Sequence, residues 1–238
     1  MHSIETDLTK HKYMIAMPCY DGMVHVTTTN SLIKTSAYLN SNGVPFHFNL
    51  IRGGALIDAV RNDLALTFLQ SDCDTIVWID ADISWEIKDI ERLLVFSHHY
   101  PIVSGAYTCK TDPPKFLITF DDHKPDENGL YKVASLGLGF TAVQRQVFEK
   151  LKETTEHYED PHKGVQVPAF FRIMLKNGLY VGEDIHFFQE AKKAGFQAYL
   201  DPEINLEHTG LKTFNTKLSE VLYGEKVQLS NMGDSSLS

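Results

Sequence analysis

The sequence has little of what secreted, membrane-spanning and disulfide-bonded proteins depend on. Only three of its 238 residues are cysteines, Cys19, Cys73 and Cys109. They form no CxxC pair, which argues against a disulfide framework or a zinc site and for reduced thiols. No apolar run approaches the roughly 20 residues that a membrane span needs. The first segment, "MHSIETDLTKHKY", has no apolar core, so we expect no signal peptide and a cytoplasmic protein.

Positive charge is also scarce. The chain has 22 Lys and Arg against 31 Asp and Glu, which gives a formal net charge of −9. A protein that grips a nucleic-acid backbone needs a basic face, so we expect no extended nucleic-acid surface. We find no internal repeat and no shift in composition, and the length suits one domain. We expect this domain at residues 13–215, after an extension at 1–12 and before a partly disordered tail at 216–238.

Short apolar runs alternate with helical patterns through the first half of the chain. Strands are expected at residues 13–18, 46–54, 75–80 and 101–107, and helices at 24–42, 55–70 and 87–96. Such alternation is typical of a mostly parallel sheet covered by helices on both faces. The sequence therefore predicts an α/β fold.

The second half is less regular. Strands at 115–120 and 130–140 flank a turn-rich loop and predict a mixed or antiparallel extension of the sheet. The remaining expectations are a helix at 144–152, a long polar loop at 153–167, a helix entered through Gly182 and short closing strands after 196.

Two aspartates, Asp80 and Asp82, directly follow the apolar run "TIVWI". Ligands of open α/β sheets bind at the carboxyl ends of the strands, and residues two apart in extended chain point the same way. Both carboxylates can therefore face one ligand, and Mg²⁺ or Mn²⁺ bridging to phosphates suits them. The alternative is a helix-capping role for Asp82 or Ser84. The same spacing in Asp72-Cys73-Asp74 precedes the strand, where we expect only a solvated turn.

Several segments together resemble a known family. They are "PCYDG" after the first expected strand, "VRND" in the second helix, "IDADISW", and "VGEDIHF" followed by "EHTG". Over roughly residues 13–210 the chain is similar to GT-A glycosyltransferases, closest to small family-2-like enzymes, including those of large viruses and phages. The resemblance implies the single-domain GT-A fold, a nucleoside diphosphate sugar as donor, with UDP-hexose favoured, and Mn²⁺ or Mg²⁺ as cofactor. For a viral protein, the location would be the host cytoplasm.

The resemblance also implies which residues hold the donor. These are Pro18, Tyr20, Asp21, Arg52, Arg61, Asn62, Asp80, Ala81 and Asp82. Tyr20 would stack on the base and Asp21 would accept a hydrogen bond from it, or the loop is simply packed. The two arginines would contact the diphosphate by planar, bidentate hydrogen bonds, unless they lie on a helix face or the surface.

Glu183 and Asp184 open the expected helix after Gly182. Capping and the helix dipole alone favour carboxylates there. In the resembling enzymes such a pair faces the acceptor hydroxyl, on a glycan or a modified nucleotide, and one carboxylate is the general base; Asp184 is preferred to Glu183. The resemblance further implies that His208 joins Asp80 and Asp82 as a metal ligand, with a surface or core histidine as the alternative.

Three other functions compete with this interpretation. A haloacid-dehalogenase-like phosphatase would use Asp80 as nucleophile and Asp82 as acid, but its motif should end the first strand of the core. A sugar nucleotidyltransferase would need a Gly-rich, Arg-containing loop where this chain has "PCYDG". A non-catalytic sugar-binding module would not need Asp80, Asp82 and Asp184 intact.

Overall fold

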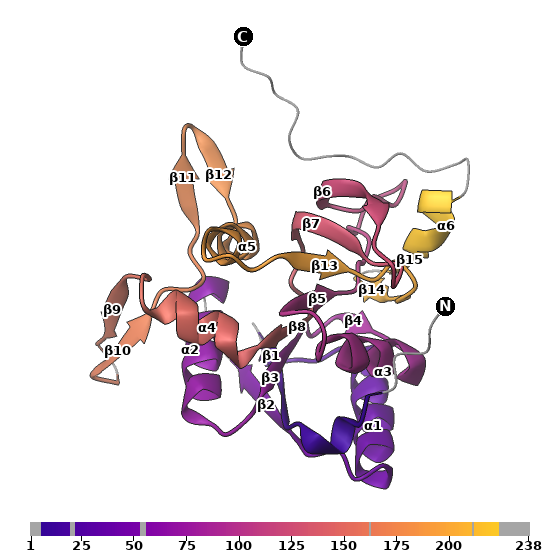
Figure 1. Ribbon diagram of the computed structural model, residues 1–238, viewed down its shortest axis with the longest axis horizontal. Helices are drawn as coiled ribbons and strands as arrows, with labels where there is room; N and C mark the ends of the chain where they lie inside the picture. Colours follow the sequence, from indigo (N-terminus) through magenta and orange to yellow (C-terminus); the bar gives the residue numbers. More distant parts are fainter. Residues whose placement is uncertain (1–5, 20–21, 53–55, 162, 211, 224–238) are drawn as a thin grey trace.

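A central sheet of eight strands runs through the molecule (Figure 1). The computed structural model describes residues 6–223 except 20–21, 53–55, 162 and 211. The strands of this sheet are β1 (Tyr13–Cys19), β2 (Phe46–Arg52), β3 (Thr75–Ile79), β5 (Ile102–Ser104), β6 (Ile118–Pro125), β7 (Tyr131–Leu136), β8 (Phe140–Gln144) and β13 (Ala198–Leu200). Their spatial order is β2-β1-β3-β8-β5-β13-β7-β6.

Strand directions bring several loops to one edge of this sheet. β1 pairs in parallel with β2 and β3, and β5 pairs in parallel with β13. β8 lies antiparallel between β3 and β5, so the latter two strands run in the same direction. The segments that follow β1, β3 and β5 therefore meet at the same edge, together with the segment that precedes β8.

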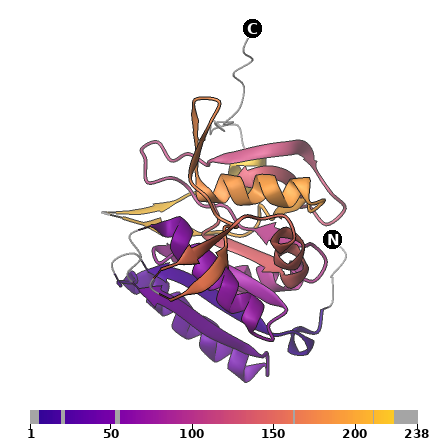
Figure 2. The same cartoon turned by 90° about the vertical axis from the view of Figure 1, so that its left-hand side faces the viewer.

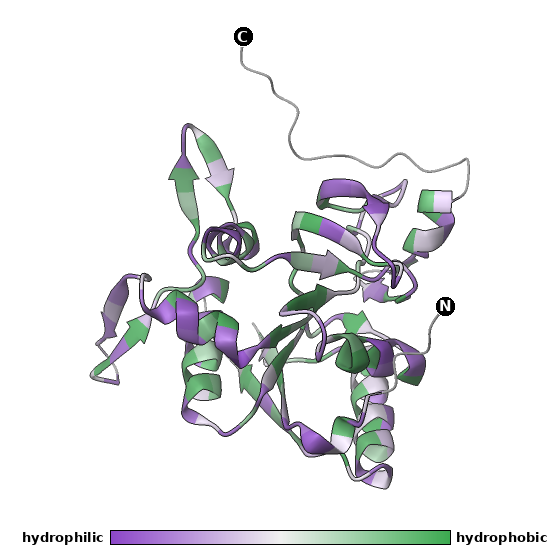
Figure 3. Cartoon of the chain, in the orientation of Figure 1, coloured by the Kyte–Doolittle hydropathy of each residue, from purple (hydrophilic) through white to green (hydrophobic). Residues whose placement is uncertain are grey.

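Helices cover both faces of the sheet, and Figure 2 shows α5 lying above the N-terminal half of the chain. The helices are η1 (Leu8–Lys10, a 3-10 turn), α1 (Val26–Ser41), α2 (Ile57–Gln70), α3 (Ile87–Phe96), α4 (Arg145–Lys152), α5 (Glu183–Lys193) and α6 (Leu218–Tyr223). Because successive strand residues point to opposite faces, Ile76 and Trp78 of β3 pack with α2 and α4, whereas Val77 and Ile79 pack with α1 and α3. Figure 3 shows that the central strands are mostly hydrophobic, whereas the helices mix hydrophobic and hydrophilic residues.

Three small sheets complete the chain. They are the hairpin β9 (His157–Asp160) with β10 (Val165–Pro168), the hairpin β11 (Met174–Lys176) with β12 (Leu179–Val181), and the group β15 (Thr213–Asn215), β14 (Glu207–Thr209) and β4 (Ile83–Ser84). In the last group His208 lies opposite Ile83, which brings the C-terminal part of the chain to the segment after β3.

The expected α/β class, a mixed sheet flanked by helices, is confirmed. Three details differ. The polar segment 153–167 contains the hairpin β9–β10, whose largely exposed strands carry too few apolar residues to be recognised. The strand expected at 130–140 is interrupted after Leu136, so that β7 and β8 are separate strands. Helix α6 lies in the expected tail and buries Leu218 and Val221.

Candidate active site

A cleft of about 640 Å³ opens at the carboxyl edge of the sheet. Its lining combines charged groups, with Asp80, Asp82 and Arg61 among them, and an apolar wall. The lining residues are Pro18, Met23, Val24, His25, Val26, Ile57, Arg61, Asp80, Ala81, Asp82, Tyr107, Glu183 and His208. These residues come from segments spread over most of the chain, and the strand directions described above bring them together.

Asp80 is held in place from three sides. Its backbone amide donates to the carbonyl of Gly139 at 3.0 Å. Its Oδ1 accepts a hydrogen bond from Nη2 of Arg61 at 2.9 Å, and its Oδ2 accepts one from the hydroxyl of Tyr107 at 3.4 Å. The carboxylate nevertheless stays 27% exposed toward the cleft. Asp80 is therefore a fixed, accessible negative charge.

Arg61 is the buried cation of the site, with a side chain only 4% exposed. Besides Asp80, it contacts Oε1 of Glu183 through Nε at 3.4 Å. Burial lowers the pKa of Arg61, but the charges of Asp80 and Glu183 outweigh burial and raise it overall. Its Nη1 has no hydrogen-bond partner within the described parts of the chain. A buried guanidinium with a spare donor suits an anionic ligand, because leaving such a donor unsatisfied costs about 1–3 kcal/mol.

Asp82 lies between two basic side chains. Nζ of Lys110 is 2.5 Å from its Oδ2, and Nε2 of His208 is 3.5 Å from its Oδ1. Burial raises the pKa of Asp82, but the contacts with His208 and Lys110 are stronger and bring it to about 2. Asp82 is thus ionised at neutral pH.

The donor atoms around Asp82 and His208 fit a divalent metal. Nδ1 of His208 lies 2.7 Å from the carbonyl oxygen of Thr108, which can only accept, so Nδ1 carries the proton. The other ring nitrogen, Nε2, faces Asp82. A metal-binding histidine typically donates its other N–H to such an acceptor, and nitrogen with carboxylate oxygen suits Mn²⁺. Over the described residues, no group of three His, Cys, Asp or Glu side chains is arranged for a metal.

Asp184 follows Glu183 in the first turn of α5. Its Oδ1 accepts a hydrogen bond from the backbone amide of Ile185 at 2.7 Å. Burial, with the charge of Glu183 as the next cause, raises its pKa to about 6. Such a carboxylate is a stronger base than an ordinary one and is still largely ionised at neutral pH. Glu183 lines the cleft, whereas Asp184 is not among the lining residues.

Tyr107 and two glycines shape the floor behind Asp80. The Tyr107 hydroxyl accepts a hydrogen bond from the amide of Gly139 at 3.2 Å and donates to Asp80. A Cβ at Gly139 would collide with Oδ2 of Asp80, and one at Gly137 would collide with the Tyr107 hydroxyl. Burial, then the charge of Asp80, raises the pKa of Tyr107 well above its usual value, so it is a neutral donor. The glycines in "SLGLGF" therefore make room for these two side chains.

Some residues expected at the site lie elsewhere. The Asn62 amide bonds the backbone of Phe171 in both directions, at 3.0 and 2.9 Å, and points away from the charged cleft. Arg52 ends β2, and its side chain lies outside the described part of the structure. Tyr20 and Asp21 are outside the described residues altogether.

Tyr107 and Lys110 are site residues that the sequence interpretation missed. Both follow β5, which runs parallel to β3, and their sequence "SGAYTCK" contains no recognisable motif. The rule that ligands bind beyond the carboxyl ends of parallel strands, applied to β5 as it was to β3, points to this segment. Met23, Val24 and Ile57, which form the apolar wall of the cleft, also lie in segments without a recognisable motif, so the sequence interpretation did not predict this wall.

Comparisons with known proteins reveal similarity in structure but not in sequence. No known protein family and no curated protein matches the sequence. Among solved structures, A197 from STIV is 18% identical with a TM-score of 0.53, over 94% of this chain and 99% of its own. GalNAc-T7, crystallised with UDP, GalNAc and Mn²⁺, is 10% identical with a TM-score of 0.52; the match covers 83% of this chain but only 44% of GalNAc-T7. These similarities show that the chain has a GT-A-like fold.

No helix within the described ranges is both long and apolar enough to cross a membrane.

Proposed function

We propose that this protein is a glycosyltransferase that moves a sugar from a nucleoside diphosphate sugar, with UDP-hexose as the expected donor, to an acceptor hydroxyl. One observation carries the proposal. A single cleft at the carboxyl edge of the sheet combines two aspartates, a buried arginine and an apolar wall. In open α/β sheets this edge is where ligands bind.

The two sides of the cleft suit the two parts of such a donor. Met23, Val24, Val26 and Ile57 offer apolar surface for a base and ribose. Arg61 lines the cleft and offers a planar positive charge, which binds a diphosphate well. Asp80 and Glu183 hold this guanidinium in place.

Asp82 and His208 would hold a divalent metal, Mn²⁺ in preference to Mg²⁺ because of the imidazole, and Asp80 would join them once its carboxylate turned from Arg61 and Tyr107. When bound, such a metal acts as a Lewis acid toward the leaving diphosphate. Asp82 has a pKa of about 2 and therefore supplies a negative charge to the metal at neutral pH. The Tyr107 hydroxyl holds Asp80 in position.

Asp184 is the proposed general base. It removes the proton from the acceptor hydroxyl as that oxygen bonds to the anomeric carbon, and the bond from this carbon to the diphosphate breaks with its electron pair. The nucleoside diphosphate leaves, and the proton remains on Asp184. Its pKa of about 6 supports this role. Glu183 instead orients Arg61.

A thermal-shift panel tests the donor half of the proposal. UDP, GDP, CDP and TDP are each added with and without Mn²⁺. A ligand at 100 times its dissociation constant adds about 2.7 kcal/mol of stability, which is readily measured. We expect UDP with Mn²⁺ to give the largest shift, and the matching sugar nucleotides then serve as donors in a turnover assay. The proposal would be contradicted if none of the four nucleotides gave a thermal shift.

A turnover assay distinguishes the proposed glycosyltransferase from the phosphatase alternative. A phosphatase of that kind needs an aspartate free to attack phosphorus, whereas both oxygens of Asp80 are hydrogen-bonded. Release of inorganic phosphate from p-nitrophenyl phosphate, with no release of nucleoside diphosphate from sugar nucleotides, would favour that alternative.

A further inference from the structure

Lys110 contacts Asp82, and the sequence interpretation did not predict this contact. Its ammonium lies 2.5 Å from Oδ2 of Asp82, on the carboxylate oxygen opposite to the one nearest His208. The Lys110 side chain is 35% exposed and that of Asp82 is 28% exposed. The pair therefore lies at the surface of the cleft, within reach of a ligand.

The surrounding backbone directs Lys110 to this position. A Cβ at Gly210 would come within 3.0 Å of Cδ of Lys110, so the aliphatic part of the lysine passes close to the backbone of Gly210. One residue earlier, the amide of Thr209 donates to the carbonyl of Asp82 at 2.9 Å. The strand end that carries His208 thus packs against both members of the pair.

A divalent ion and the Lys110 ammonium both require the Asp82 carboxylate. Two cations at one carboxylate repel each other, so a metal bound by Asp82 and His208 weakens the hold of Asp82 on Lys110. Once released, the ammonium is a mobile point charge at the end of a flexible stem, and such a group binds phosphate well.

We propose that Lys110 is the resident cation of Asp82, which a divalent metal displaces and which then contacts the diphosphate of the donor. The first half concerns the metal and the chain alone. The second half rests on the proposed function. Together they make Lys110 both a competitor for metal in the free protein and a binding residue in the complex.

The first experiment titrates Mn²⁺ alone into the full chain, with free Mn²⁺ measured by electron paramagnetic resonance. Lys110→Met should bind Mn²⁺ roughly three- to tenfold more tightly than the unmodified protein, because the competing ammonium is gone. Lys212→Met is the matched control. It also removes one positive charge, but Lys212 pairs with Asp112 and does not contact Asp82. Its Mn²⁺ affinity should not change.

The second experiment measures UDP binding at Mn²⁺ concentrations that saturate each protein, because the metal is what releases Lys110 from Asp82. Lys110→Met should bind UDP roughly tenfold or more weakly, the usual weight of a charged hydrogen bond. Lys212→Met should again match the unmodified protein.

The outcomes distinguish this inference from the proposed function. Equal or weaker Mn²⁺ binding by Lys110→Met, or no Mn²⁺ binding by either protein, overturns the exchange at Asp82. Unchanged UDP binding by Lys110→Met at saturating Mn²⁺ overturns the contact with diphosphate. If Lys110→Met binds Mn²⁺ more tightly but no protein binds UDP, the exchange holds and the proposed function fails.

Discussion

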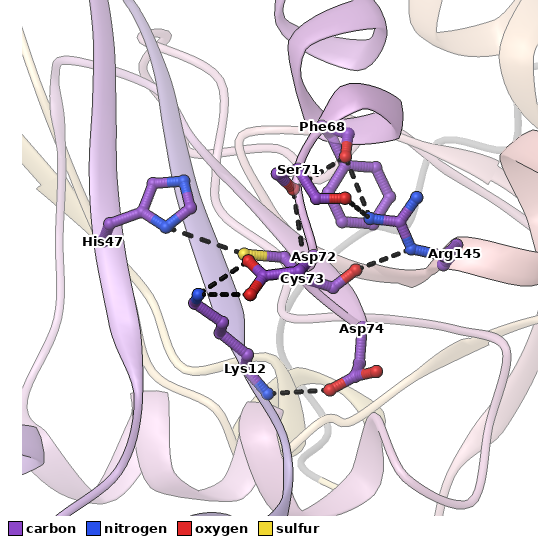
Figure 4. Close-up of polar contacts among 8 residues, drawn as sticks. All are labelled: Lys12, His47, Phe68, Ser71, Asp72, Cys73, Asp74 and Arg145. Carbon is purple, nitrogen blue, oxygen red and sulfur yellow. Dashed lines mark hydrogen bonds and ion pairs between the residues drawn. The ribbon is translucent and has the colours of Figure 1, made fainter.

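Strand β3 has an Asp-x-Asp triplet at each end, and the two have different surroundings. At the amino end, Asp72 is 76% exposed and pairs with Nζ of Lys12 at 2.6 Å, while Asp74 accepts from the Lys12 amide (Figure 4). At the carboxyl end, Asp80 is 27% exposed and pairs with the buried Arg61. One pair of aspartates faces solvent and the other faces a cleft.

The difference shows that spacing alone does not make a site. Figure 4 shows that the amino-end triplet belongs to the turn between α2 and β3, where Arg145 donates to the carbonyls of Phe68, Ser71 and Cys73. This turn is structural. The carboxyl-end triplet lies where parallel strands end together and where segments after β1 and β5 supply further groups. The end of β3 at which an Asp-x-Asp triplet lies, rather than the triplet itself, decides whether its aspartates belong to a turn or to a cleft.

Amide substitutions at the two ends test this comparison with the largest expected effect. Asp80→Asn and Asp82→Asn each remove a charge from the proposed metal site and should lower transfer roughly 10³-fold, the weight of a strong electrostatic contribution to catalysis. Asp72→Asn and Asp74→Asn should stay within about twofold. The measurement is release of nucleoside diphosphate at saturating Mn²⁺. Near-normal turnover of either cleft variant would contradict the proposed role of that aspartate.

Removal of the two basic partners gives the next largest effect. Arg61→Met leaves Asp80 and Glu183 without their buried counter-charge, so the free energy of unfolding should fall by about 3 kcal/mol. Lys12→Met removes an exposed partner of Asp72 and should leave stability unchanged within error. Urea unfolding of both variants gives the comparison. Equal destabilisation of the two would mean that the burial of Arg61 has no energetic consequence.

The sequence predicted the fold and the centre of the site better than it predicted the site's periphery. Strand and helix periodicity located β3 and α3, and the position of Asp80 and Asp82 after β3 indicated the cleft. Tyr107 and Lys110 were missed because they lie in a loop, where side chains follow no periodicity and only the end of β5 indicates a site. Asn62 was assigned to the donor from "VRND", but the helical turn that points Arg61 at Asp80 points Asn62 at Phe171.

Adding a methyl group next to Asp80, at the carboxyl end of β3, should affect stability and transfer less than removing a charge. Gly139→Ala places a methyl group against Oδ2 of Asp80 and 2.8 Å from the Tyr107 hydroxyl, so we expect a loss of about 1–3 kcal/mol in stability, as for other overpacked sites. Transfer should fall as well, because Asp80 has to move. Gly137→Ala is the control, since its methyl group meets Tyr107 but not Asp80. If both variants transfer sugar equally well, the exact position of Asp80 is not critical.

The smallest expected effect is on the pH dependence of the free energy of unfolding. A titrating group near each end of the sheet should change this dependence in opposite directions. Near the cleft, burial and then Glu183 raise the pKa of Asp184 from 3.8 to about 6. At the amino end, where Tyr13 bonds His98 at 2.5 Å, burial and then His11 lower the pKa of His98 from 6.5 to about 4. Both groups therefore titrate differently in the folded and unfolded chains between about pH 4 and 6.

The signs follow from which state holds the proton in this window. Folded Asp184 keeps a proton that the unfolded chain has released, so its contribution to stability falls as pH rises from 4 to 6. The unfolded chain keeps a proton on His98 that the folded protein lacks, so that contribution rises with pH. Asp184→Asn should therefore make stability rise more steeply from pH 4 to 6, and His98→Gln should make it rise less or fall. Each change should be on the order of 1 kcal/mol across the window.

Urea unfolding at pH 4.5, 5.5 and 6.5 measures the stability curves of the unmodified protein and the two variants. Parallel curves for the unmodified protein and both variants would show that neither group is buried enough to shift its pKa, and would remove the main support for Asp184 as the base.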